Sequence, residues 1–239
     1  MTGPILAIQL LTRLPLPRVA ASEADFARAI RWFPAAGLVV GLAVAAAAML
    51  GMQAGPRIGA LCALTAWIAI TGALHLDGLA DIADAAGAAH ADPDRLYAVL
   101  RDPHVGSFGA VAIGLQLLAK LVLVERALAD GLIAALLVVP CVARIGPLCW
   151  TLWLPPLHEG LASRFRAGIA LPHLIAWMLA LLPALWLFPA LAAAPLLIGG
   201  WGLFLGRRIG GISGDGHGAG IEIVESGLLI CLVLGPRIA

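Results

Sequence analysis

The sequence predicts an all-α, polytopic integral membrane protein with about seven transmembrane helices. Of its 239 residues, 62% are hydrophobic and 12% are charged, and the mean hydropathy is +0.99. Soluble domains average about 45–50% apolar and about 25% charged residues. A transmembrane helix needs about 20 residues, so the chain has room for seven spans and short connections but for no separate soluble domain. We therefore expect residues 1–239 to form a single transmembrane helical domain.

Seven apolar runs lie between charged residues and turn-forming residues, and each is long enough to be a candidate span. In chain order they are residues 35–52, 58–74, 106–124, 132–154, 171–188, 190–206 and 219–235. The fifth and sixth runs contain Pro183, Pro189 and Pro195, any of which can kink a helix or form the turn between two helices. Residues 1–17 are a further apolar segment that we expect at the membrane interface.

The distribution of arginine predicts the orientation. Basic residues favour cytoplasmic loops, and a seven-span topology with the N-terminus inside places most loop arginines in the cytoplasm. These are Arg13, Arg18, Arg28, Arg31, Arg95, Arg101, Arg164, Arg166, Arg207 and Arg208, whereas Arg57, Arg126 and Arg237 fall outside. The same topology brings the acidic segment at residues 71–87 and the glycine-rich turn at 211–220 to one cytoplasmic face.

Two cations lie inside apolar runs. Lys120 is close to the outer end of the third span, where we expect its side chain to extend to the lipid headgroups. Arg144 is near the middle of the fourth span, where a cation costs at least about 2.5 kcal/mol on insertion scales. We expect Arg144 to face a polar cavity or an acidic partner. A role in binding substrate or phosphate and a purely structural ion pair both stay open.

The most informative segment is residues 71–87, TGALHLDGLADIADAAG. Asp77, Asp81 and Asp84 have offsets of four and seven, which place them on one face of a helix over about 10 Å. Carboxylates this close repel each other, so they predict a bound cation. Oxygen ligands with no cysteine nearby favour Mg²⁺, Mn²⁺ or Ca²⁺ over zinc, and Mg²⁺ takes one or two carboxylates plus substrate phosphate. His75 is a candidate base, a partner of a metal ligand or an interfacial residue.

A polar segment precedes the third span. Residues 90–109, HADPDRLYAVLRDPHVGSFG, hold a helical turn between two breaks that contain Asp and Pro, followed by small residues. Arg101, Asp102 and Ser107 lie just before a helix begins, where backbone N–H groups and a hydroxyl can meet an anion. An ordinary connecting loop with capping residues is the alternative.

The last span begins in a glycine-rich segment, residues 210–225, GGISGDGHGAGIEIVE. Glycines allow the backbone to approach a ligand closely. Acidic residues that continue into an apolar helix are costly without a function, which makes Asp215 and Glu222 candidates for substrate binding. A flexible connector is the alternative.

Taken together, these segments resemble the cobalamin synthases, also called adenosylcobinamide-GDP ribazoletransferases. The resemblance covers nearly the whole chain, and its most specific part is the signature HLDGLADxxD. It rests on QLLTRLPLP at residues 9–17, RWFPAAGLVVG at 31–41, LHLDGLADIADAAG at 74–87, LRDPHVGSFGAVA at 100–112, VARI in the fourth span and GISGDGHGAGIEIVE near the end. His217 stands where the family commonly has another residue, so no role is carried over to it.

The resemblance implies a Mg²⁺-dependent enzyme of vitamin B12 biosynthesis in the bacterial cytoplasmic (inner) membrane. It joins the cobinamide phosphate of adenosylcobinamide-GDP to the ribose hydroxyl of alpha-ribazole, or of its 5'-phosphate, and releases GMP. Asp77, Asp81 and Asp84 would hold metal against the diphosphate, with Asp84, the most distant, as a candidate to accept the hydroxyl proton. The candidate substrate-binding residues are His75, Arg101, Asp102, Ser107, Arg144, Asp215 and Glu222.

Other functions and partners stay open beside this one. The aspartate spacing is also similar to that of the CDP-alcohol phosphotransferases, but the chain lacks the Ala-Arg pair after their first acidic motif and their fourth aspartate at the usual spacing. A cation-coupled transporter would place its acids near the bilayer midplane, whereas the topology places these at one interface. A net charge of +1 gives nucleic-acid binding little support. A homo-oligomer and association with other corrinoid-assembly enzymes are open as well.

Overall fold

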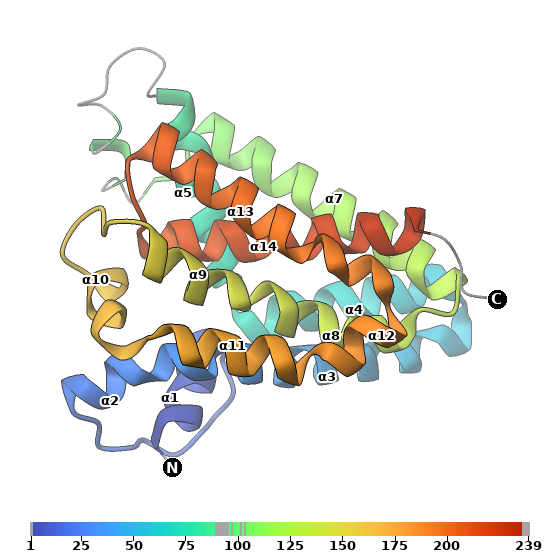
Figure 1. The fold of residues 1–239 in the computed structure, drawn as a ribbon. Helices are drawn as coiled ribbons and strands as arrows, with labels where there is room; N and C mark the ends of the chain where they lie inside the picture. Colours follow the sequence, from blue (N-terminus) through green and yellow to red (C-terminus); the bar gives the residue numbers. More distant parts are fainter. Residues whose placement is uncertain (1, 89–95, 97, 101, 103, 236–239) are drawn as a thin grey trace.

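The structure, a computed structural model, describes residues 2–88, 96, 98–100, 102 and 104–235. All regular elements among these residues are helices, apart from a single parallel bridge between Pro156 and Ile212. The long helices lie side by side in one elongated bundle (Figure 1). The predicted all-α polytopic membrane fold is confirmed.

Five helical segments of the described residues are long and apolar enough to cross a membrane. The first joins α2 (Glu23–Arg28), η1 (Ala29–Trp32), α3 (Phe33–Gly51) and η2 (Met52–Ala54). The others are α7 (Ser107–Ala129), α8 (Ile133–Ala143) with α9 (Ile145–Trp153), η4 (Pro189–Ala193) with α13 (Ala194–Phe204) and η5 (Leu205–Ile209), and α14 (Gly214–Leu234). α4 (Pro56–Thr71) and α5 (Leu74–Ala88) meet at a bend of 84°. They count as a sixth span only if the two bent helices are taken together as one.

The predicted count of seven spans is not confirmed. The run at residues 171–188 folds as two short helices, α11 (Leu171–Ala180) and α12 (Leu182–Leu187), which join at Leu181. Pro183 follows that junction and has no N–H for the helical hydrogen bond, so the first helix cannot continue smoothly into the second. The remaining short elements are α1 (Thr2–Leu11), α10 (Leu161–Phe165) and η3 (Arg166–Gly168).

The bend between α4 and α5 consists of two consecutive residues in the left-handed conformation. Gly72 has a φ of 62° and Ala73 a φ of 59°. Their N–H groups bond the carbonyls of Ala69 and Ile68 at 3.3 and 3.1 Å, which satisfies the end of α4. A Cβ at Gly72 would lie 2.3 Å from the side chain of Arg13, so this position requires glycine for space as well as for its φ. The bend turns α5 away from the α4 axis.

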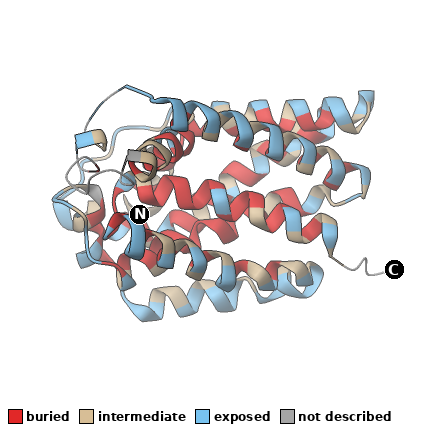
Figure 2. Ribbon diagram, turned by 90° about the horizontal axis from the view of Figure 1, so that it is seen from above, coloured by how far each residue is buried: buried red, intermediate tan, exposed pale blue. Residues whose placement is uncertain are grey.

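Small residues allow the central helices to pack closely. A Cβ at Gly37 or Gly41 of α3 would lie 2.5 and 2.2 Å from the carbonyl oxygens of Pro140 and Leu137 in α8. This is the close backbone approach that glycines four residues apart provide in membrane helices. Buried residues accordingly concentrate on the inner faces of the bundle, and exposed apolar residues cover the outside (Figure 2).

One end of the bundle gathers segments that are distant in the sequence. The connection after α9 pairs with the turn before α14, through the N–H of Leu157 to Ile212 O and the N–H of Ile212 to Pro155 O, both 2.9 Å. α10 and α5 lie at this same end, at the left of Figure 1. The structure therefore brings together the acidic segment, the region of Arg164 and the glycine-rich turn.

Candidate active site

α5 presents an acidic face at this end of the bundle. Leu79 and Ile82 of this helix are buried, whereas Asp77 is exposed and Asp81 and Asp84 are half-buried. The three aspartates lie in a single helix, as their spacing predicts. The helix therefore keeps its carboxylates accessible while its other face packs in the bundle.

The first turns of α14 pack directly on α5 at two glycines. A Cβ at Gly78 would lie 2.8 Å from the carbonyl oxygen of Asp215, and a Cβ at Gly218 would lie 3.2 Å from the Cα of His75. Because any larger side chain would separate the backbones, these glycines fix how closely the two helices approach each other. Gly78, which lies between the aspartates in the sequence, is thus needed for the close approach of α14 to α5.

This packing adds a fourth carboxylate to the acidic face. Asp81 lies within electrostatic range of Asp215, Asp77 and Asp84, and Asp215 lies within electrostatic range of Asp77. Among the described residues, no three Asp, Glu, His or Cys side chains already converge on one point as a finished metal site. Mg²⁺ needs only one or two carboxylates when phosphate and water supply the other oxygens. The donor set therefore fits Mg²⁺ bound together with a phosphorylated substrate.

Asp84 has a definite partner of its own. Its Oδ2 accepts the N–H of Gly106 at 2.7 Å and its Oδ1 accepts the N–H of Gly109 at 2.9 Å. These N–H groups belong to the N-terminus of α7, which carries a positive partial charge. A Cβ at either glycine would lie within about 2.5 Å of this carboxylate. Asp84 therefore caps α7 and joins it to α5.

The segment before α7 contains three predicted residues. Ser107 is the first residue of α7 and is exposed beside the Asp84 cap. Asp102 is exposed and accepts hydrogen bonds from the N–H and the Nδ1 of His104, at 3.0 and 2.7 Å, which lower the pKa of its carboxyl group. Arg101 lies outside the described residues. The structure therefore places Ser107 next to the acidic face and leaves the role of Arg101 a prediction.

Arg144 and Glu222 lie deeper, in a network of buried charges. Arg144 Nη1 donates to Glu225 Oε1 at 2.9 Å, and Lys120 Nζ donates to Glu225 Oε2 at 2.5 Å and to Glu222 Oε2 at 2.7 Å. Gln116 Nε2 donates to Glu222 Oε2 at 2.8 Å and to the Oγ of Ser226 at 2.9 Å. Two cations thus balance two anions. Each of these four charged side chains is at most 4% exposed.

The expectation for Lys120 is wrong. Its side chain is 2% exposed and points into the bundle, where its Nζ lies 4.3 Å from the ring centre of Trp67. Two glutamates of α14 lie within reach of the ammonium group and pair with it, so the buried charge is compensated inside the bundle. For Arg144, the structure shows the acidic partner that the sequence analysis proposed as one of two alternatives.

His75 connects this network to the acidic face. It lies in the first turn of α5, two residues before Asp77, and is 2% exposed. Its Nδ1 is 3.5 Å from Arg144 Nη2. Because an arginine only donates hydrogen bonds, Nδ1 acts as the acceptor and Nε2 carries the proton. That Nε2 has no partner among the described residues. His75 therefore faces the bundle interior, and the aspartates that follow it face outward.

Glu222 and Glu225 lie near the middle of α14, the depth that a transporter would use for its acids. Both are fully paired with cations, however, and the cavity next to Lys120 and Glu222 has a volume of about 10 Å³. That space holds about one water molecule. The mid-span acids thus form part of a closed framework, and the exposed acids are at one end of the bundle.

The pairing of these groups is not evident from the sequence. Arg144, Lys120 and Glu222 are far apart in the chain, and neither Gln116 nor Ser226 was predicted to take part. The available signal was the balance of charges inside the spans, because two cations and two glutamates indicate mutual pairing. Gln116 gives no comparable signal, because its partners lie more than 100 residues away in the sequence.

Comparison with known proteins identifies the family. The family model described as cobalamin-5-phosphate synthase matches residues 3–233. A protein of Novosphingobium aromaticivorans named adenosylcobinamide-GDP ribazoletransferase is 57% identical over 98% of this chain and 97% of its own length. Proteins of the same name from Laribacter hongkongensis and Brevibacillus brevis are 48% and 31% identical, over 100% and 95% of this chain and 99% and 96% of their own lengths. No solved structure matches significantly. The chain belongs to the cobalamin-5-phosphate synthase family.

Proposed function

We propose that the acidic face of α5, together with the start of α14, is the site at which this chain carries out the reaction of its family. The chain is an adenosylcobinamide-GDP ribazoletransferase, a membrane-embedded transferase of cobalamin synthesis. It joins adenosylcobinamide-GDP to alpha-ribazole, or to alpha-ribazole 5'-phosphate, and GMP leaves. The observation that carries the site assignment is the packing of Asp215 against Gly78, which gathers four carboxylates at one end of the bundle.

Asp77 and Asp81 are the proposed Mg²⁺ ligands. Neither carboxylate accepts a hydrogen bond from another described residue, so both are free to bind a cation, and Asp215 is close enough to contribute. Bound Mg²⁺ would neutralise charge on the diphosphate and on the departing phosphate of GMP. The acidic face alone would repel the diphosphate, and this supports a cation as part of the active enzyme.

The proposed role of Asp84 changes once its contacts are known. Each of its oxygens already accepts an N–H of α7, which leaves it poorly placed to take the hydroxyl proton. We assign it to holding the start of α7 beside the acidic face. Ser107 and Asp102 then lie where they could contact substrate, and Ser107 has an exposed hydroxyl at a helix N-terminus, a position that suits an anion.

The buried residues receive a supporting role in this proposal. Arg144 is fully buried and bound to Glu225, and Glu222 is bound to Lys120. Substrate could reach either side chain only if this network opened. We propose that they hold α7, α8 and α14 together around His75 and so fix the position of α5, instead of contacting substrate.

The acidic face is proposed to lie on the cytoplasmic side of the bacterial inner membrane, with the N-terminus inside. Exposed arginines of the same end of the bundle support this orientation, among them Arg164, Arg166, Arg207 and Arg208. Basic residues next to spans favour the cytoplasm. Association with a second copy or with other corrinoid-assembly enzymes stays a prediction.

The proposal is tested with purified protein in detergent. Given adenosylcobinamide-GDP, alpha-ribazole and Mg²⁺, the protein should release GMP and form the joined corrinoid in equal amounts. Omission of alpha-ribazole should abolish GMP release, which separates transfer from hydrolysis. CDP-diacylglycerol with an alcohol acceptor should yield no CMP. A folded protein that forms no corrinoid product would contradict the proposal.

A further inference from the structure

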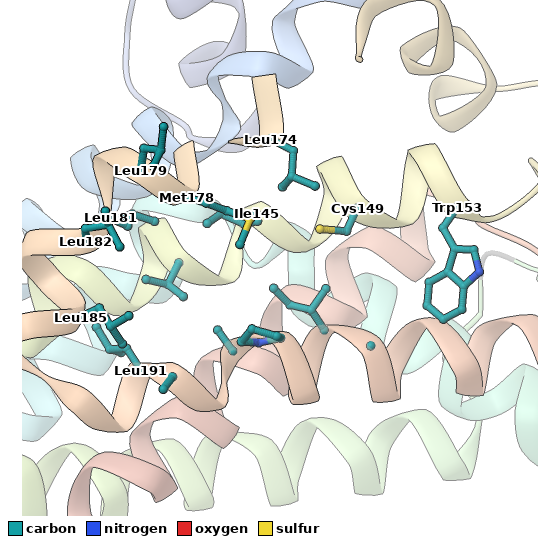
Figure 3. A pocket seen from close by; sticks show the side chains of 16 residues that line it. Ile145, Cys149, Trp153, Leu174, Met178, Leu179, Leu181, Leu182, Leu185 and Leu191 are labelled. Atoms are coloured by element: carbon teal, nitrogen blue, oxygen red, sulfur yellow. The ribbon is translucent and has the colours of Figure 1, made fainter. Parts of the chain in front are cut away.

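A large apolar cavity lies between α9, α13 and the α11–α12 pair. Its volume is about 640 Å³. Its lining residues come from α8, α9, η4, α13, α11, α12 and the junction between α11 and α12. Ile145, Cys149 and Trp153 line it along α9 (Figure 3). Ile198 and Gly199 of α13 line it as well. We call this cavity the apolar wedge. The acidic site has no residue in it.

The shape of the apolar wedge suits an extended hydrocarbon. Leu185 and Leu191 lie at one end and the indole of Trp153 lies at the other (Figure 3). The walls from α9 and α13 belong to candidate membrane spans, so the wedge lies at the depth of the lipid chains. α11 and α12, which form its third side, contain no buried residue. If this apolar space were unfilled, the side chains of its walls would lack contacts. Because hydrocarbon is the solvent at this depth, a lipid chain is the natural occupant.

Two exposed arginines lie beyond the Trp153 end of the apolar wedge. Trp153 packs against Gly202, with a ring carbon 2.5 Å from where a Cβ would lie, and Leu154 is adjacent to Gly206. Arg207 and Arg208 follow directly in η5 and are exposed. Neither has an acidic partner among the residues that the structure describes. Arginine binds phosphate strongly, and tryptophan favours the headgroup level of a membrane.

We propose that the apolar wedge is a binding site for an anionic phospholipid. One acyl chain lies between α9, α13 and the α11–α12 pair, and the phosphate lies at Arg207 and Arg208. The lipid would add packing to α11 and α12, which contain no fully buried residue. It would thereby connect the least buried helices to the end of the bundle that carries the acidic face.

Two glycines of α13 provide a matched test. A Cβ at Gly199 or Gly200 meets no atom within 4 Å, but only Gly199 lines the apolar wedge. Gly199→Leu therefore fills the wedge, and Gly200→Leu makes the same chemical change outside it. After purification from vesicles of phosphatidylglycerol and phosphatidylcholine in equal amounts, the lipid retained by each protein is measured by native mass spectrometry.

Wild type and Gly200→Leu should retain phosphatidylglycerol in preference to phosphatidylcholine, and Gly199→Leu should lose it. Arg207→Ala/Arg208→Ala should lose the preference, since each surface arginine contributes about a fivefold gain in binding of anionic lipid. Equal retention by the two glycine variants would overturn the proposal, as would equal retention of the two lipids by wild type. If Gly199→Leu keeps its lipid but raises KM for adenosylcobinamide-GDP, the wedge holds substrate and the proposal is also wrong.

Discussion

Glu225→Gln should destabilise the protein far more than the loss of an ordinary ion pair. Glu225 is 0% exposed and accepts hydrogen bonds from both Arg144 and Lys120, at 2.9 and 2.5 Å. With Glu222, it balances two buried cations, so its removal leaves one uncompensated positive charge in the centre of the bundle. Breaking a buried pair in this way costs about 3–5 kcal/mol. For a chain of this length, that corresponds to a fall in Tm of about 6–20 °C.

The assay is thermal unfolding in detergent, with two variants for comparison. Glu125→Gln removes the half-buried partner of Arg57, a pair with an N–O distance of 3.3 Å whose arginine is 84% exposed. Such surface pairs contribute about 0–1 kcal/mol. Lys120→Met/Glu225→Gln restores the charge balance and should recover part of the loss. The reasoning is wrong if Glu225→Gln and Glu125→Gln have the same Tm, or if the double variant is less stable than Glu225→Gln alone.

Two further variants test the packing around the acidic face. Asp84→Asn puts an amide NH₂ against one of the two α7 N–H groups and weakens the cap by about 1 kcal/mol, so both Tm and turnover should fall; an unchanged Tm would contradict the capping role. Gly78→Ala should reduce turnover strongly, because its Cβ would lie 2.8 Å from Asp215 O, whereas Gly114→Ala, with no atom within 4 Å, should gain up to about 1 kcal/mol of stability. Equal turnover in the two alanine variants would argue against close packing of α5 on α14.

The helices and the acidic face could be predicted from the sequence because both depend on local spacing. Apolar runs determine where most spans lie, and offsets of four and seven place Asp77, Asp81 and Asp84 on one side of α5. The 84° bend before α5 could not be predicted. It requires a left-handed conformation at Ala73, which is intrinsically unfavourable for a residue with a side chain. The N–H of Ala73 bonds Ile68 O at the end of α4.

The pairing of side chains between distant helices also could not be predicted from the sequence. Lys120 looked like a residue at the end of a span, and only the position of α14 shows that two glutamates surround its ammonium group. Asp84 looked equivalent to Asp77 and Asp81, because spacing along one helix says nothing about which neighbouring helix meets each residue. Its role as a cap depends on where α7 begins.

The central claim is that the carboxylates of Asp77 and Asp81 bind the cation needed for transfer. GMP release from adenosylcobinamide-GDP and alpha-ribazole, measured across a Mg²⁺ titration, tests it most directly. Asp77→Asn and Asp81→Asn should each lower turnover about a hundredfold or more, the effect expected from loss of one electrostatic contact to the transition state, with an unchanged Tm and a shifted Mg²⁺ dependence. Glu125→Gln, at the opposite end of α7, should match wild type. Wild-type turnover and Mg²⁺ dependence in both aspartate variants would contradict the claim.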